Sequence, residues 1–214
     1  MPHSHWTVVV PVKRLDDAKT RLQSTREGTA GRELALAFAC DTVASVLACP
    51  SVAMVAVVTP DETVHSALPD GVRRIGEPGD EGLNAAISHA CTALPPRPVA
   101  VIVSDLPSLH ADELSAALDT AASNDFSFVP DSDGTGTVLL ASKRPDLLRP
   151  QFGEGSASVH ESAGAARLDG DWPTLRNDVD TRADLKDALA MGAGRHTVSA
   201  LHAMNDDDLA HVEH

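Results

Sequence analysis

Uninterrupted apolar runs of strand length recur along the chain, and segments with helical periodicity lie between them. The apolar runs cover residues 6–12, 52–59, 99–104, 126–130 and 137–141, and their continuous hydrophobicity predicts strands that are covered on both faces. Apolar residues recur at helical spacing in 31–48, 81–94 and 111–122, and residues 182–191 form one more candidate helix. This alternation predicts an α/β fold, with a mixed, mostly parallel central sheet and helices on both faces.

The order of the segments also bears on domain organisation. Residues 126–130 and 137–141 follow each other closely, which predicts an antiparallel pair within the sheet. No internal repeat or low-complexity linker divides the 214 residues. We therefore expect residues 1–214 to form a single domain, with a loosely tethered tail from about residue 195.

Charge and cysteine content narrow the classes of partner. The chain has 31 acidic and 17 basic residues, a formal net charge of −14, which disfavours nucleic acid and anionic membrane surfaces as partners. No apolar window reaches the length of a membrane span, and the three cysteines, Cys40, Cys49 and Cys91, lack the spacing of a disulfide or zinc framework. We expect a soluble, cytoplasmic protein in which any anion-binding site locally reverses the charge.

Glycine and hydroxyl residues are concentrated between residues 130 and 164. Glycine lets backbone N–H groups approach an anion closely, and Thr135, Thr137, Ser156 and Ser158 add neutral hydroxyl donors, so the segment is suited to cradling a phosphate. The alternative is that Gly-Thr-Gly-Thr is only a hairpin turn leading into a strand. His160, four residues after Ser156, is either a phosphate donor or an ordinary histidine near the start of a helix.

A basic loop follows the first predicted strand. Lys13 and Lys19 lie just past its carboxyl end, where ligands bind in open parallel sheets. The loop matches neither the Gly-x-x-x-x-Gly-Lys-Ser/Thr pattern nor the Gly-x-Gly-x-x-Gly pattern, so a different nucleotide-binding fold is required. Alternatively, these lysines belong to a solvated basic patch.

Three aspartates are candidates for a metal site. Asp105 ends the run VAVIVSD, and Asp178 and Asp180 form an Asp-x-Asp triplet whose alternate side chains share a face if the segment is extended. Carboxylates converging from distant positions are suited to Mg²⁺, which prefers oxygen ligands and bridges carboxylates to substrate phosphates. The alternatives are a turn at Asp105 before Pro107 and a helix N-cap at Asp180.

Taken together, these motifs resemble the 2-phospho-L-lactate/phosphoenolpyruvate guanylyltransferase family of coenzyme F-420 biosynthesis, which has a GT-A-like nucleotidyltransferase fold. The resemblance runs nearly end to end. It is carried, in the family's order, by VPVKRLDDAKTRL, ELALAFACDTVASVL, VVTPDETV, GLNAAISHA, VSDLPSL, FVPDSDGTGTVLLA, PQFGEGSASVHESAGA and LRNDVDTRADL.

The resemblance implies transfer of GMP from GTP to the phosphate of a small phosphorylated carboxylic acid, with phosphoenolpyruvate favoured over 2-phospho-L-lactate, and release of pyrophosphate. It implies that Thr137, Gly153 and Ser156 hold the acceptor acid, that Asp105, Asp178 and Asp180 hold Mg²⁺, that Lys13, Lys19, Gly82 and Asn84 face the nucleotide, and that Lys13 and Lys19 act in catalysis. Val159 and Pro60 depart from the family pattern, which has an arginine and an acidic residue there. A homodimer stays open as the assembly.

Other functions remain open at this stage. A related nucleotidyltransferase with another acceptor, such as 3-phosphoglycerate, a molybdopterin or a sugar phosphate, would share the fold and the metal ligands. A glycosyltransferase would use the Asp-x-Asp triplet on a nucleotide sugar. A non-catalytic nucleotide-binding protein would bind GTP without releasing pyrophosphate, and its aspartates would serve only as caps and turns.

Overall fold

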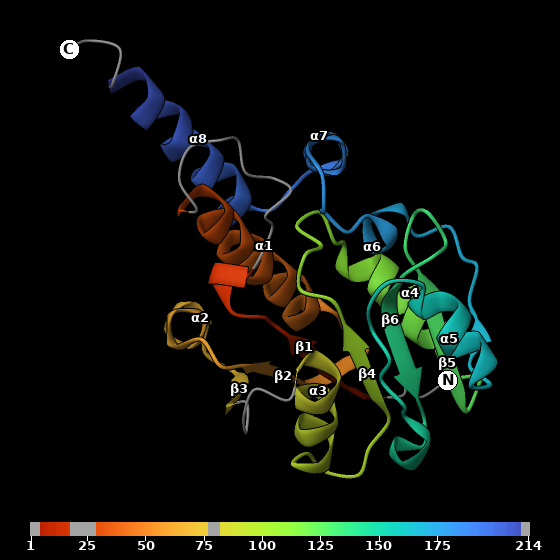
Figure 1. Ribbon diagram of the computed structural model, residues 1–214. Coiled ribbons are helices and arrows are strands. Elements are labelled where there is room, and N and C mark those ends of the chain that lie inside the picture. Colours follow the sequence, from red (N-terminus) through yellow and green to blue (C-terminus); the bar gives the residue numbers. More distant parts are fainter. Residues whose placement is uncertain (1–4, 18–28, 77–81, 211–214) are drawn as a thin grey trace.

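The computed structural model describes residues 5–17, 29–76 and 82–210 (Figure 1). Its described part contains one seven-stranded sheet with the strand order β3-β2-β1-β4-β6-β5-β7. The strands are β1 (Trp6–Pro11), β2 (Val52–Thr59), β3 (Val72–Gly76), β4 (Val99–Ile102), β5 (Phe126–Pro130), β6 (Thr137–Ser142) and β7 (Ala166–Arg167).

Strand direction changes once within the run from β3 to β6. Strand β1 pairs in parallel with β2 and β4, and β2 pairs in parallel with β3. Strand β6 runs antiparallel between β4 and β5, and β7 is parallel to β5. The predicted mixed, mostly parallel sheet and its antiparallel β5–β6 pair are confirmed. Because β6 is reversed, its first residues lie at the same sheet edge as the carboxyl ends of β1 and β4.

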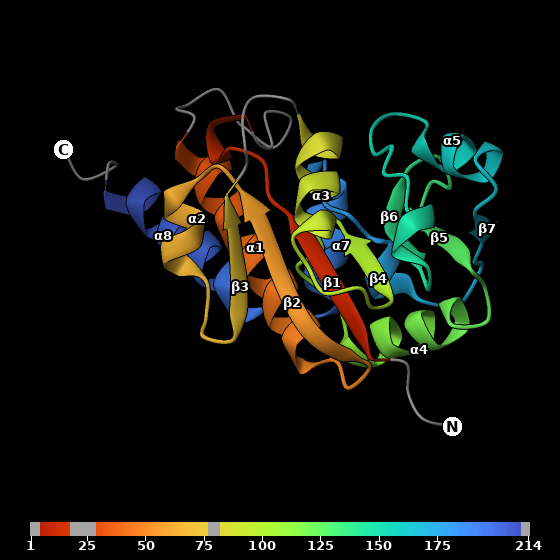
Figure 2. The ribbon, with the colours of Figure 1, turned by 90° about the horizontal axis from the view of Figure 1, so that it is seen from below.

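Helices cover both faces of the sheet, as predicted. The helices are α1 (Thr29–Ala48), α2 (Glu62–Ala67), α3 (Leu83–Thr92), α4 (Ala111–Ala121), α5 (Ser156–Ser162), α6 (Pro173–Arg176), α7 (Arg182–Met191) and α8 (Arg195–Ala210), with 3-10 turns at Leu15–Asp17 and Pro145–Leu147. Helices α1 and α4 pack on one face, and α3 and α5 pack on the other (Figures 1 and 2).

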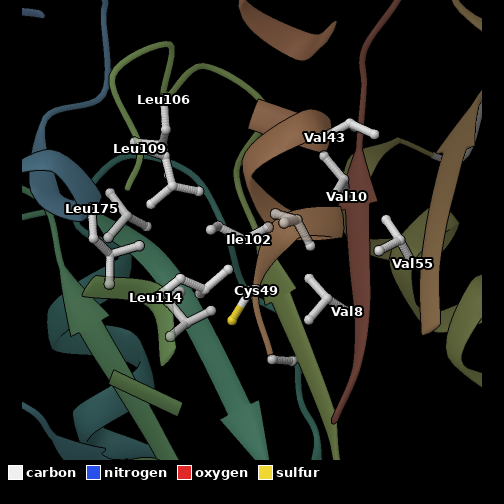
Figure 3. Close-up of a cluster of buried hydrophobic side chains, with 14 of the residues drawn as sticks. Val8, Val10, Val43, Cys49, Val55, Ile102, Leu106, Leu109, Leu114 and Leu175 are labelled. Carbon is white, nitrogen blue, oxygen red and sulfur yellow. The ribbon is translucent and has the colours of Figure 1, made fainter. Parts of the chain in front are cut away.

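The two-sided cover explains the uninterrupted apolar runs. In β1, Val8 and Val10 contribute to the cluster under α1 and α4, whereas Val9 belongs to the cluster under α3. All three side chains are fully buried, and each contributes about 1.5 to 3 kcal/mol through burial. Figure 3 shows the first cluster, in which Ile102 of β4 lies among the valines of β1 and the leucines that follow β4.

The carboxyl-terminal segment differs from the loose tail expected from residue 195. It forms α8, which packs along α1 (Figure 1). Asp41 of α1 fixes its start, because its carboxylate accepts hydrogen bonds from the backbone N–H groups of His196 and Thr197 at 3.0 and 2.8 Å. No helix within the described ranges is both long and apolar enough to cross a bilayer.

Candidate active site

The loop after β1 begins at the carboxyl edge of the sheet. The Val12 N–H donates to the carbonyl of Val58 at 2.9 Å, which extends the β1–β2 pairing by one residue. The next residue, Lys13, is exposed, and its charge is therefore available to an anionic ligand at this edge. Lys19 lies outside the described residues, so its predicted role stays a prediction.

Asp105 follows β4, and a buried threonine holds the backbone on both sides of it. The hydroxyl of Thr42, on α1, donates to the carbonyl of Ser104 at 3.2 Å and accepts from the N–H of Leu106 at 3.1 Å. Thr42 and Leu106 are fully buried. The position of Asp105 is therefore set by a packed helix and not only by its own loop.

The Asp-x-Asp triplet lies beside Asp105. The N–H of Val179 donates to the carbonyl of Asp105 at 3.0 Å, and the Val179 side chain is fully buried against Leu34 and Phe38 of α1. Asp178 and Asp180 thus flank a residue that is anchored in the core. The structure thus brings the backbone of Asp105 next to this triplet.

Asp180 is not the N-cap of the helix that follows. Thr181 is the N-cap of α7, and its hydroxyl accepts from the N–H of Asp184 at 3.3 Å. Asp184 completes a capping box by accepting from the backbone N–H of Thr181. Asp180 is an exposed residue, and the helix is capped by its neighbour Thr181.

The electrostatics indicate a concentration of negative charge around Asp178. Burial, the largest cause, and the neighbouring charges of Asp105, Asp131 and Asp180 together raise the pKa of Asp178 to about 7. We call Asp105, Asp131, Asp178 and Asp180 the aspartate cluster. Three of its members were predicted as metal ligands, whereas Asp131 was not.

The aspartate cluster has the donor chemistry that Mg²⁺ requires, because carboxylate oxygens are its preferred ligands. Repulsion among these groups would also be relieved by a divalent cation. Within the described ranges, however, no three acidic, histidine or cysteine side chains are already arranged to hold a metal ion. The residues therefore fit Mg²⁺ by chemistry and charge, without a preformed coordination shell.

The hydrogen bonds of Asp131 show whether the Gly-Thr-Gly-Thr motif is a phosphate cradle or a hairpin turn. Its carboxylate accepts hydrogen bonds from the N–H groups of Thr135 and Gly136 at 2.9 and 2.7 Å, and its carbonyl accepts from the Arg176 guanidinium at 3.0 Å. Gly136 leaves no room for a Cβ beside this carboxylate. Residues 131–136 are thus a braced hairpin turn, and these two amides serve the protein itself.

The three predicted acceptor-binding residues do come together. Thr137 begins β6 and is buried, and Ser156 begins α5 and is 2 % exposed. The N–H of Ser156 donates to the carbonyl of Gly153 at 3.1 Å, and the N–H of Ala157 donates to the carbonyl of Thr135 at 3.1 Å. We call Thr137, residues 151–155 and Ser156 the acceptor cradle.

Glycine is required at two positions of the acceptor cradle. Gly153 has a φ of 139° and Gly155 a φ of 68°, which side chains with a Cβ rarely adopt. These conformations turn the chain sharply into α5.

His160 is buried and forms hydrogen bonds with two parts of the acceptor cradle. Its Nδ1 lies 2.9 Å from the hydroxyl oxygen of Thr137, and its Nε2 accepts the N–H of Gln151 at 3.1 Å. The ring lies near those of Phe128 and Phe152, with centroids 6.0 and 5.5 Å away. Burial lowers the pKa of His160 to about 4. Because both nitrogens are engaged by the protein, His160 is not itself a phosphate donor in this conformation.

Asn84 connects the acceptor cradle to α3. Its side-chain oxygen accepts from the N–H of Phe152 at 2.8 Å, and its amide nitrogen donates to the carbonyl of Phe152 at 3.1 Å. Gly82, two residues earlier, is the N-cap of α3 with a φ of 87°. The pairing with Phe152 joins the first turn of α3 to the loop that precedes α5.

Comparison with known proteins identifies the family. A family model described as guanylyl transferase CofC like matches residues 6–207. The chain belongs to this family. A phosphoenolpyruvate guanylyltransferase of Geodermatophilus obscurus is 46 % identical over 202 residues, which cover 92 % of this chain and 94 % of that protein.

Solved structures place the family fold among nucleotidyltransferases. A nucleotidyl transferase from Methanothermobacter superposes with a TM-score of 0.61 at 18 % identity, covering 87 % of this chain and 97 % of that chain. A 4-diphosphocytidyl-2C-methyl-D-erythritol synthase from Anaerococcus prevotii gives 0.55 at 13 % identity, with 87 and 95 % coverage. At these identities the likeness establishes the fold, and it agrees with the predicted nucleotidyltransferase architecture.

Several residues that shape the site of this guanylyl transferase family member escaped the sequence analysis. They are Thr42, Asp131, Arg176 and Val179, all of which position backbone or carboxylates. Asp131 had a detectable signal, because an aspartate before Ser-Asp-Gly is typical of a side chain that caps its own turn. Thr42 lies inside a helix and has no comparable sequence signal.

Proposed function

We propose that this protein transfers a guanylyl group from GTP to the phosphate of phosphoenolpyruvate and releases pyrophosphate, in the biosynthesis of coenzyme F-420. The observation that carries the proposal is the meeting of the acceptor cradle and the aspartate cluster at one sheet edge, where Asp131 both interacts with Asp178 and braces the turn before Thr137. Membership of the guanylyl transferase family and the name of the Geodermatophilus relative support the donor and the acceptor.

The proposed reaction needs no general base. A phosphate monoester is already anionic near neutral pH, so its oxygen can attack the α-phosphorus of GTP directly. The P–O bond to pyrophosphate breaks as the new P–O bond forms, and the pyrophosphate leaves with its electron pair. The barrier lies in bringing anions together and aligning them, which is work for positioned donors and positive charge.

Positive charge must therefore be concentrated locally in a protein of net charge −14. Lys13, exposed after β1, would neutralise phosphates of GTP, and Lys19 would assist it. Asp105, Asp178 and Asp180 would hold Mg²⁺, which when bound supplies the divalent charge that lets two phosphorylated molecules share a site.

On the acceptor side, neutral donors are proposed to bind the phospho-acid. The Thr137 hydroxyl, the backbone at Gly153 and the Ser156 hydroxyl would contact it, since hydroxyl and amide groups bind anions without adding charge. The Asn84–Phe152 pairing would keep this acid in register with the nucleotide.

The test is mass spectrometry of the product formed from GTP, Mg²⁺ and an equimolar mixture of phosphoenolpyruvate, 2-phospho-L-lactate and 3-phosphoglycerate. The expected product has the mass of the guanylyl adduct of phosphoenolpyruvate, with stoichiometric pyrophosphate. An adduct of one of the other two acids corrects the acceptor alone. Absence of pyrophosphate with all three acids refutes the proposed reaction.

A further inference from the structure

The hydrogen bonds around His160 fix which ring nitrogen carries the proton. The Gln151 N–H points at Nε2 over 3.1 Å, and a nitrogen that accepts a hydrogen bond cannot carry a proton. Burial keeps the ring neutral at neutral pH by lowering the pKa of His160 to about 4. A neutral imidazole has one proton, so that proton must be on Nδ1.

This tautomer determines the role of Thr137. His160 Nδ1–H donates to the Thr137 hydroxyl oxygen over the observed 2.9 Å. A hydroxyl that accepts from the ring must point its own hydrogen elsewhere. Among the described residues, the Thr137 hydroxyl makes no second hydrogen bond that would take up that hydrogen.

We propose that His160 is a positioning residue that holds the Thr137 hydroxyl as a hydrogen-bond donor aimed at the anionic acceptor. The proposal rests on the proposed function for the identity of that acceptor and for its binding at Thr137. Its geometric basis is the chain from the Gln151 N–H through the imidazole to Thr137, clamped between Phe128 and Phe152. The relay links the loop of the acceptor cradle to the first residue of β6.

The same contacts explain why a histidine occupies this buried position. Its ring accepts from the loop on one side and donates to the strand on the other, which a single aliphatic side chain cannot do. His160 is fully buried, so leaving either partner unsatisfied would carry a desolvation cost. The relay therefore orders the loop and sets the direction of the Thr137 O–H bond together.

The first experiment reads the tautomer without using activity. Long-range ¹H–¹⁵N correlation spectra of uniformly ¹⁵N-labelled protein distinguish Nδ1–H from Nε2–H, and the spectrum of the His160→Asn variant assigns the His160 signals among the ten histidines. We expect the Nδ1–H tautomer at pH 7. An Nε2–H tautomer overturns the proposal, whatever reaction the protein catalyses.

The second experiment compares two variants of nearly equal shape. His160→Asn keeps an N–H close to the position of Nδ1, whereas His160→Leu removes it, and both lose the acceptor for Gln151. We expect the KM for phosphoenolpyruvate to rise more than about twofold above the wild-type value in both variants, and to be roughly 3- to 10-fold higher in the Leu variant than in the Asn variant. The KM for GTP should be equal in the two. Equal KM values for the acceptor in both variants contradict the relay.

A double-mutant cycle separates positioning from simple packing. Thr137→Val removes the hydroxyl while keeping the shape, and should lower kcat/KM for the acceptor roughly 10- to 100-fold, as expected for a hydrogen bond to a charged group. In that background, exchanging Asn for Leu at position 160 should change nothing further. An undiminished difference between Asn and Leu there refutes the proposal. If the mass spectra name another acid as acceptor, that acid replaces phosphoenolpyruvate in both kinetic tests.

Discussion

Neutralising Asp178 should stabilise the metal-free protein while destroying its activity. Folding raises the pKa of Asp178 from its ordinary 3.8 to about 7, so the folded state binds this proton more tightly than the unfolded chain does. Stability is therefore lost as the pH rises from about 4 to about 7. At about 1.4 kcal/mol per pKa unit, the ionised carboxylate costs up to about 4 kcal/mol above that range. The Asp178→Asn variant has no carboxylate at this position, so its folded state is not destabilised in this way.

The assay is urea unfolding in EDTA at pH 8 and pH 5. At pH 8 the Asn variant should be more stable than the wild type by about 2 to 4 kcal/mol, and at pH 5 by about 1 to 2 kcal/mol, because the wild-type carboxyl is then protonated in the folded state. Asp70→Asn, in the exposed turn before β3, removes the same charge and should change stability by less than about 0.5 kcal/mol.

The same substitution that raises stability should lower activity. With Mg²⁺ present, pyrophosphate release by the Asp178→Asn variant should fall by orders of magnitude, and that by Asp70→Asn should not change. An Asn variant that is no more stable than the wild type at pH 8, or whose advantage is independent of pH, would refute the argument from the raised pKa of Asp178. Near-normal turnover would refute the role of Asp178 as a metal ligand.

Three further substitutions test how the site is positioned. Val179→Ala should cost about 2 kcal/mol in urea unfolding and should lower kcat more than it raises either KM, since the valine anchors the two flanking aspartates; a wild-type kcat would contradict this. Asp131→Ala should raise the KM for the phospho-acid and leave that for GTP within about twofold, because it releases the turn before β6; equal rises would be inconsistent with that role. Asn84→Ala should raise both KM values, since it frees Phe152; a change confined to GTP would instead indicate direct contact with the nucleotide.

Much of the fold could be predicted from the sequence because buried strands have a strong signal. The runs around β1, β2 and β4 are continuous because these strands are covered on both faces. Strand β3 was missed because it carries two exposed arginines, Arg73 and Arg74, between its buried residues. Strand β7 has only two residues and no pattern to detect.

Helix α8 shows a different limit of prediction from the sequence. Helix α8 has little amphipathic pattern in its sequence, and its start is fixed by Asp41, some 150 residues away along the chain. Such tertiary contacts override local propensity. The same applies to the candidate site, where motifs indicated which residues carry the chemistry, whereas the residues that hold them in place, such as Thr42, became visible only with the fold.

The reversal of β6 has a consequence for how this family could diversify. Because β6 runs antiparallel to β4, it begins at the edge of the sheet where the candidate site lies. The turn before β6, Thr137 and the start of α5 therefore reach the site from one contiguous stretch, residues 131–160. The aspartates at 105, 178 and 180 and the lysine after β1 come from other parts of the chain. Under the proposed function, natural selection could therefore exchange one acid for another by changing this single stretch, while the residues proposed to bind the triphosphate stay unchanged.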